Sequence, residues 1–206
     1  MDRVTPPYDM FPPTVRKTFG LNRRFFLIFE PLLASAQLII ACVIAYFTLS
    51  VAAGAQIVAL GASDVAGWFG VSHHQAWPAQ LEEMLKAKGY NVHVKNAGKP
   101  GDTPWGLLHR LDSAVPSGTK IVILAKEGLY ANNQLSQLKA DEGMNTVEMK
   151  LKSRGITIIP ANAGVVLQNP GFRIDNAHLS AAGHKELATR LLPLVIRALG
   201  SPSPSG

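Results

Sequence analysis

Short apolar runs and helix-spaced apolar positions alternate along the chain from residue 56 onward. Apolar runs rich in β-branched residues predict buried strands, and apolar residues three or four positions apart predict amphipathic helices. Strands are expected at 56–60, 91–95, 121–124 and 156–159, and helices at 76–88, 104–111, 135–153 and 180–199. Alternating strands and helices predict a parallel sheet with helices on both faces. The fold class is therefore α/β, a three-layer α/β/α sandwich with about four or five strands.

The first 55 residues follow another pattern. Arg23 and Arg24 precede a long apolar stretch that ends in Ala-Gly-Ala at residues 53–55. A basic flank, an apolar run and an A-x-A site together predict an export signal that is cleaved before residue 56. The apolar stretch at residues 25–53 is also long enough to span a bilayer, so an uncleaved membrane anchor is the alternative. Either interpretation places the rest of the chain outside the cytoplasm, periplasmic or secreted in one case and membrane-anchored in the other.

Composition and charge limit the remaining possibilities. We expect one folded domain at residues 56–200, after an N-terminal extension at 1–55 and before a Ser/Pro/Gly tail at 201–206 whose composition predicts disorder. The 15 Lys and Arg residues beyond position 55 are scattered and face 11 Asp and Glu, so nucleic-acid binding is not expected. The single Cys42 excludes an internal disulfide and any multi-cysteine metal site. A monomer without metal or cofactor is expected.

Two blocks carry candidate chemistry at strand ends. Ser63 directly follows the strand predicted at 56–60, and ligands bind at the carboxyl ends of strands in open α/β sheets. It is a candidate nucleophile, although a serine there can also cap the next helix. The second block runs from Asn96 to Thr103, and its Gly101 allows the backbone to approach a substrate. Asp102 can be interpreted as a cap before the helix predicted at 104–111.

A third block lies near the C-terminus. Asp175 and His178 are three residues apart in one predicted loop. That spacing allows the carboxylate to hold Nδ1 of the imidazole while Nε2 faces a serine, as in a Ser-His-Asp triad. His184, six residues further on, is interpreted as a packing residue or as a residue that supports the site.

These blocks resemble the SGNH hydrolase superfamily, also called the GDSL esterase/lipase family, and in particular its bacterial thioesterase I, lysophospholipase and arylesterase group. The resemblance implies a flavodoxin-like α/β/α fold with Ser63 as nucleophile and with Asp175 and His178 completing a triad. It also implies that the backbone N–H groups of Ser63 and Gly101 form the oxyanion hole. The implied substrates are carboxylic esters of small molecules or lipids, or thioesters.

The block after the strand at 121–124 departs from the family pattern. Where the family usually has Gly-Gly-Asn-Asp, this chain has Ala-Lys-Glu-Gly-Leu, and Leu129 falls where the oxyanion-hole asparagine is expected. Asn132 or Asn133 could replace it after a local shift. Loss of one oxyanion donor typically costs about 10²–10³ in rate. We therefore expect a weak exported hydrolase. The alternative is a catalytically degenerate SGNH-fold protein that binds an acylated ligand or a partner.

Overall fold

The computed structural model describes residues 57–67 and 70–201. The expected export signal or anchor at residues 1–55, including the apolar stretch at 25–53, lies outside the described residues, as does the tail beyond residue 201. These expectations stay predictions, and so do the expected domain boundaries. Across the two described ranges, no helix has both the length and the apolar character needed to cross a membrane.

The described residues form one parallel sheet in the order β2-β1-β3-β4. Its strands are β1 (Ile57–Gly61), β2 (Val94–Gly98), β3 (Ile121–Leu124) and β4 (Thr157–Pro160). The pairing aligns the carboxyl ends of the strands, with Gly61 opposite Gly98 and Leu60 opposite Leu124. The loops that follow β1, β2 and β3 therefore leave the sheet at the same edge, where the candidate residues are located.

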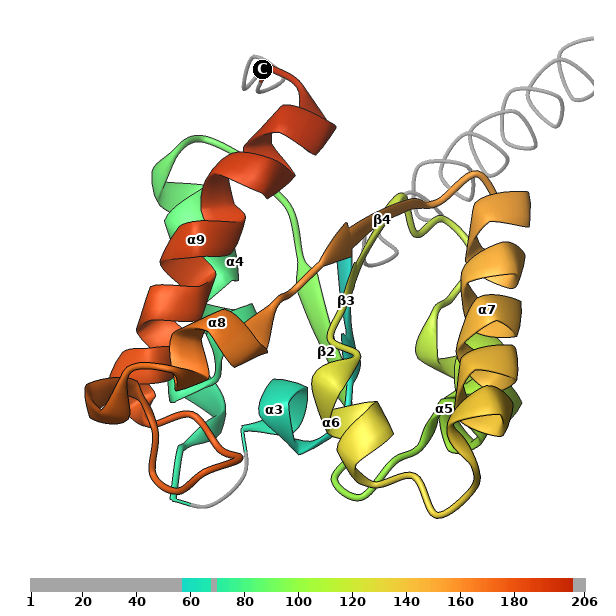
Figure 1. Cartoon of the computed structure of the whole chain (residues 1–206). Helices are drawn as coiled ribbons and strands as arrows, with labels where there is room; N and C mark the ends of the chain where they lie inside the picture. Colours follow the sequence, from blue (N-terminus) through green and yellow to red (C-terminus); the bar gives the residue numbers. More distant parts are fainter. Residues whose placement is uncertain (1–56, 68–69, 202–206) are drawn as a thin grey trace, which may run out of the picture. The chain divides into compact units, whose positions relative to one another are not determined.

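Helices cover both faces of this sheet (Figure 1). On one face α4 (Trp77–Ala87) packs beside α9 (Ala181–Leu199), and on the other face α5 (Pro104–Ala114) packs beside α7 (Gln137–Ser153). The predicted three-layer α/β/α class is confirmed. Shorter elements sit in the connections, namely α3 (Ser63–Ala66), α6 (Glu127–Ala131), α8 (Ala163–Leu167) and the 3-10 turns η3 (His73–Gln75) and η4 (Pro170–Phe172).

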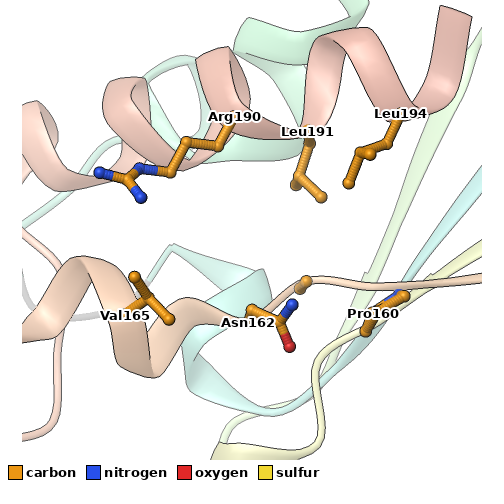
Figure 2. Close-up of a pocket in the computed structure, with 7 residues that line it drawn as sticks. Pro160, Asn162, Val165, Arg190, Leu191 and Leu194 are labelled. Carbon is orange, nitrogen blue, oxygen red and sulfur yellow. The ribbon is translucent and has the colours of Figure 1, made fainter.

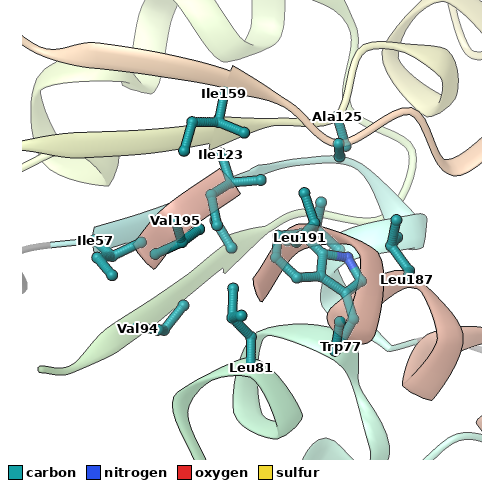
Figure 3. Packing of buried hydrophobic residues seen from close by; sticks show 14 of the residues in the cluster. Ile57, Trp77, Leu81, Val94, Ile123, Ala125, Ile159, Leu187, Leu191 and Val195 are labelled. Carbon is teal, nitrogen blue, oxygen red and sulfur yellow. The ribbon is translucent and has the colours of Figure 1, made fainter. Parts of the chain in front are cut away.

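The core lies in two layers because successive strand residues point to opposite faces of the sheet. In β1, Ile57 and Ala59 join the cluster under α4 and α9, whereas Val58 and Leu60 join the cluster under α5 and α7. Figure 3 shows the first cluster, which includes the fully buried Trp77 and Leu81 of α4, Leu187 and Leu191 of α9, and Ile57 and Ile123 of the sheet. Each such side chain contributes about 1.5–3 kcal/mol on burial. The strands that carry the candidate residues are therefore held between two packed layers.

Candidate active site

The turn after β1 places Ser63 at the sheet edge. Ser63 is the first residue of α3, and its Oγ lies 3.3 Å from Nε2 of His178. The buried carboxylate of Asp64 accepts a hydrogen bond of 3.1 Å from the backbone N–H of Ala62. On the other side, the indole N–H of Trp77 donates to the backbone carbonyl of Asp64 at 3.1 Å. Hydrogen bonds therefore fix the peptide units on both sides of the candidate nucleophile.

A narrow loop presents the other two candidate residues. An antiparallel bridge between Arg173 and Leu179 closes the loop, which carries Asp175 and His178. Oδ1 of Asp175 accepts the backbone N–H groups of Ala177 and His178, each at 2.7 Å, and Oδ2 lies 2.9 Å from Nδ1 of His178. The hydrogen bond from Ala177, together with that from the His178 ring, lowers the pKa of Asp175 to about 2. The carboxylate is therefore ionised at neutral pH.

The ring contacts define the hydrogen-bonding roles of the imidazole. Because the Asp175 carboxylate faces Nδ1, that nitrogen carries the proton, and Nε2 is left to accept from the Ser63 hydroxyl. The chain of contacts from serine to histidine to aspartate has the connectivity of a Ser-His-Asp triad. A serine-to-histidine distance of 3.3 Å is within the range expected of a site without substrate. The structure thus brings together Ser63, His178 and Asp175, the three residues that were expected from the sequence.

Gly101 lies in the loop between β2 and α5. Its φ of +72° is in the left-handed region, which glycine adopts without steric cost. The N–H of Lys99, at the start of this loop, donates to the carbonyl of Gly61 at 3.1 Å, so the loop is bonded directly to the end of β1. The Gly101 loop and the Ser63 turn are therefore neighbours. The cap of α5 is Thr103, whose side chain accepts the N–H of Gly106 at 3.1 Å, and not Asp102 as the sequence suggested.

The segment after β3 differs from expectation. Leu129 is fully buried within the cluster under α5 and α7, so it is a core residue and not a position that faces the candidate site. The two alternative donors make other bonds: the Asn132 amide donates to the carbonyl of Asp102 at 3.1 Å, and the Asn133 amide donates to that of Leu135 at 2.7 Å. Asn132 thus contacts the Gly101 loop, whereas Asn133 bonds within its own exposed turn.

Comparisons with known proteins agree on the fold. No family model and no curated protein sequence matches the chain. Among solved structures, it is similar to a protein assigned to the lipolytic G-D-S-L family from Desulfitobacterium hafniense, with a TM-score of 0.60, 17% identity and coverage of 68% of this chain and 99% of that one. It is also similar to the structure of TesA, with a TM-score of 0.60, 18% identity and coverage of 69% and 98%.

A third similar structure is the psychrotrophic esterase EstA from Pseudoalteromonas, inhibited by monoethylphosphonate, with a TM-score of 0.59 and 15% identity. The alignment covers 70% of this chain and 98% of EstA. The chain has the SGNH-hydrolase fold. Nearly the whole length of each of these three structures is matched, so the likeness in fold concerns the complete domain.

Within this SGNH fold, three supporting residues were missed or only partly anticipated. Arg110 of α5 contacts both the end of β1 and the Gly101 loop. Trp77 binds the Asp64 carbonyl, and its own backbone N–H donates to Nδ1 of His184 at 3.2 Å. Burial lowers the pKa of His184 to about 4, which keeps the ring neutral and able to accept. These roles depend on contacts between distant segments, and spacing along the sequence gives no sign of them.

Asp64, next to Ser63, is a further buried ionisable group of the candidate site. Burial, reinforced by the charge of Glu127, raises its pKa to about 6, and its Oδ2 has no hydrogen-bond partner among the described residues. A Cβ at Gly128 would stand 2.9 Å from Oδ1 of Asp64, so the glycine leaves room for this carboxyl group. The sequence signal was the acidic residue directly after Ser63, where the family pattern has it directly before.

A cavity of about 210 Å³ lies apart from these residues, between α8 and α9 (Figure 2). It is lined by Pro160, Ala161, Asn162, Val165, Arg190, Leu191 and Leu194. Two of these lining residues, Val165 and Leu194, are 50% and 40% exposed. No residue of the Ser63, Gly101 or His178 segments lines this cavity. In the described part of the chain, no group of three or more His, Cys, Asp or Glu side chains is placed to hold a metal ion.

Proposed function

We propose that this protein is an exported serine hydrolase that cleaves carboxylic esters. The observation that carries the proposal is the continuous chain of contacts from Ser63 Oγ to His178 Nε2, at 3.3 Å, and from His178 Nδ1 to Asp175 Oδ2, at 2.9 Å. It lies at the carboxyl edge of a parallel sheet, where open α/β folds bind ligands. Similarity in fold to esterases supports the same class of reaction.

The proposed reaction follows from the roles of these three side chains. Ser63 Oγ attacks the ester carbonyl carbon while its proton passes to His178 Nε2. The backbone N–H groups of Ser63 and Gly101 stabilise the tetrahedral oxyanion, and the ionised Asp175 stabilises the imidazolium. The C–O bond then breaks, and His178 donates its proton to the leaving alcohol. A water molecule deprotonated by His178 hydrolyses the acyl-serine and restores the free enzyme.

We expect slow turnover of small or lipid esters. The candidates are aryl esters, sugar esters, lysophospholipids and thioesters. Only two oxyanion donors are proposed, because Leu129 is buried in the core and the amides of Asn132 and Asn133 donate to backbone carbonyls. A missing third donor corresponds to a rate about 10²–10³ lower than that of a complete site.

The decisive experiment measures hydrolysis of p-nitrophenyl acetate and butyrate by the full chain and by two serine variants. Ser63→Ala should lower kcat at least about 10³-fold, because the nucleophile is lost. Ser113→Ala is the matched control, since the hydroxyl of this exposed serine of α5 donates to the backbone carbonyl of Arg110 and does not contact Ser63, and it should retain wild-type activity. A fluorophosphonate should add to the wild-type chain at Ser63, as shown by mass spectrometry of its peptides.

A degenerate binding protein is the second candidate, favoured by the same missing third donor. It predicts no Ser63-dependent turnover and no fluorophosphonate adduct, together with saturable binding of a non-hydrolysable acyl ligand. The two candidates therefore differ in both readouts.

The proposed export rests on the sequence at residues 1–55. Amino-terminal sequencing of the mature protein should begin at or near Gln56 if the signal is cleaved. A membrane-bound chain that keeps Met1 would instead indicate an anchor, and a full-length chain in the cytoplasm would contradict export.

A further inference from the structure

One guanidinium group contacts both segments that carry the proposed oxyanion donors. Arg110 projects from α5 and makes three different contacts. Its Nε lies 2.7 Å from Oδ2 of Asp102, its Nη1 donates to the carbonyl of Ala97 at 2.9 Å, and its Nη2 donates to the carbonyl of Gly61 at 3.2 Å. A single side chain thus connects the end of β1, the end of β2 and the loop that follows β2.

These contacts are adjacent in sequence to the proposed catalytic groups. Gly61 is two residues before Ser63, and Asp102 directly follows Gly101. Each N–H group proposed for the oxyanion hole is therefore within two residues of an atom that Arg110 binds. The Asn132 amide donates to the backbone carbonyl of Asp102 at 3.1 Å.

The Asp102–Arg110 pair is well protected from solvent. The side chain of Asp102 is 2% exposed and that of Arg110 is 21% exposed. A buried carboxylate is strongly destabilising unless it is paired, and the planar fork of arginine can bind the carboxylate and two carbonyls at once. Gly106 leaves the necessary space, because a Cβ at that position would collide with Oδ1 of Asp102. Lysine, with a single ammonium group, cannot reproduce this three-way contact.

We propose that Arg110, through Asp102, is a positioning residue that aligns the Gly101 loop with the Ser63 turn, so that both N–H groups meet one oxyanion. The proposal rests on the proposed ester hydrolysis. It differs from a purely structural role, in which Arg110 would stabilise the fold without affecting the chemical step of the folded enzyme.

Arg154 provides a control at the opposite ends of the strands. Nη2 of Arg154 donates to the carbonyls of Val115 and Pro116, at 2.7 and 3.1 Å, and its Nη1 lies 3.8 Å from Oδ1 of Asp112. This guanidinium also joins two backbone carbonyls and an aspartate, and its exposure of 29% is similar. Its contacts lie at the amino ends of β3 and β4, because Val115 and Pro116 precede β3 and Arg154 precedes β4, whereas the candidate site lies at the carboxyl ends. Its aspartate partner is 90% exposed, so Arg154→Lys removes a guanidinium bonded to two backbone carbonyls without touching the candidate site.

The experiment compares Arg110→Lys, Asp102→Asn and Arg154→Lys in the full chain. For Ser63-dependent ester hydrolysis, we expect the first two variants to lower kcat about 10- to 100-fold with KM within about twofold, since a misplacement of about 1 Å has such an effect. Arg154→Lys should keep kcat within about twofold. Hydrogen exchange by mass spectrometry should accelerate at residues 61–64 and 99–103 in the first two variants only.

Each outcome has a defined meaning. Normal kcat in a folded Arg110→Lys protein would overturn the proposal, and so would equal losses of kcat in the Arg110 and Arg154 variants. If the wild-type chain shows no Ser63-dependent hydrolysis, the proposed function fails, and hydrogen exchange still tests the alignment. Unchanged exchange at residues 61–64 and 99–103 would then overturn the positioning role itself.

Discussion

The loops after β1 and β3 leave adjacent strands at the same level of the sheet but face different surroundings. After β1, Ser63 is partly exposed and lies beside His178. After β3, the chain turns into α6 and buries Leu129 completely in the core. One loop therefore presents a reactive side chain at the sheet edge, whereas the other directs its corresponding side chain into the core.

Contacts with α7 explain the course of the second loop. Lys126 forms an ion pair with Glu148 of α7, and the Tyr130 hydroxyl donates to the Asp141 carboxylate at 2.9 Å. Burial, together with Asp141, raises the pKa of Tyr130 to about 12, so the hydroxyl keeps its proton for this bond. These contacts and Leu129 fix α6 against α7. The segment that departs from the SGNH pattern is therefore the segment that packs α6 against α7.

The largest effect is expected when the proposed general base is removed. His178→Ala should lower kcat for p-nitrophenyl esters at least about 10³-fold, because Ser63 loses its proton acceptor. His73→Ala and His74→Ala are the controls, since both residues are exposed in the turn before α4, and each should keep kcat within about twofold. Equal losses of kcat in all three variants would show that His178 is not the specific general base for Ser63 in the loop after β1.

Much of the fold was predictable because the spacing of apolar residues along the chain reflects which side chains are buried. The predicted strands 56–60, 121–124 and 156–159 match β1, β3 and β4 to within one residue at either end. The second strand was predicted three residues too early, because Val92 and Val94 alternate, whereas the observed strand continues through Asn96 to Gly98 in register with β1. The helices α3, α6 and α8 were missed, since four or five residues are too few to show a helical period.

The candidate site was predictable only where the residues in contact are close together in the sequence. Asp175 and His178 lie in one short loop, so their spacing indicated the contact that the structure shows. Arg110 could not be found in this way, because its partners come from β1, β2 and the loop after β2. Leu129 was compared with the oxyanion-hole asparagine because the comparison was aligned on Gly128, and the sequence contained no sign of its burial. The structure shows that Gly128 packs against Asp64 and that the next residue of the helix turns into the core.

The second prediction concerns the assignment of Leu129 to the core. Because Leu129 is fully buried in the cluster under α5 and α7, an asparagine at this position should not add an oxyanion donor. Leu129→Asn should lower the free energy of unfolding by about 3–5 kcal/mol, because it leaves a void and buries an amide among apolar side chains. Urea denaturation measures this loss, and kcat of the folded fraction should not increase.

A surface leucine provides the control for that variant. Leu138 of α7 is 77% exposed, and Leu138→Asn should change the free energy of unfolding by no more than about 0.5 kcal/mol. Similar stability of the two asparagine variants, with a higher kcat for Leu129→Asn, would show that position 129 faces the site after all.

The smallest predicted effect concerns Asp64, where the two loops meet. The pKa of Asp64 is raised from 3.8 to about 6, first by burial and then by the charge of Glu127 on α6. Between pH 4 and 6 the folded state therefore binds more protons at this group than the unfolded state, and its contribution to stability falls as the pH rises. Asp64→Asn removes this ionisation, while its amide oxygen can still accept the N–H of Ala62.

The difference in unfolding free energy between Asp64→Asn and the wild type should thus be small at pH 4 and reach about 2–3 kcal/mol in favour of the variant above pH 6. Urea denaturation at several pH values measures it. The difference is informative because His184, whose pKa of about 4 gives the opposite slope between pH 4 and 6.5, is present in both proteins and cancels. Glu127→Gln should reduce the same pH dependence, since it removes the charge that α6 places near Asp64. A difference that does not vary with pH would show that Asp64 does not titrate in this range, and that the contact between the two loops is not electrostatic.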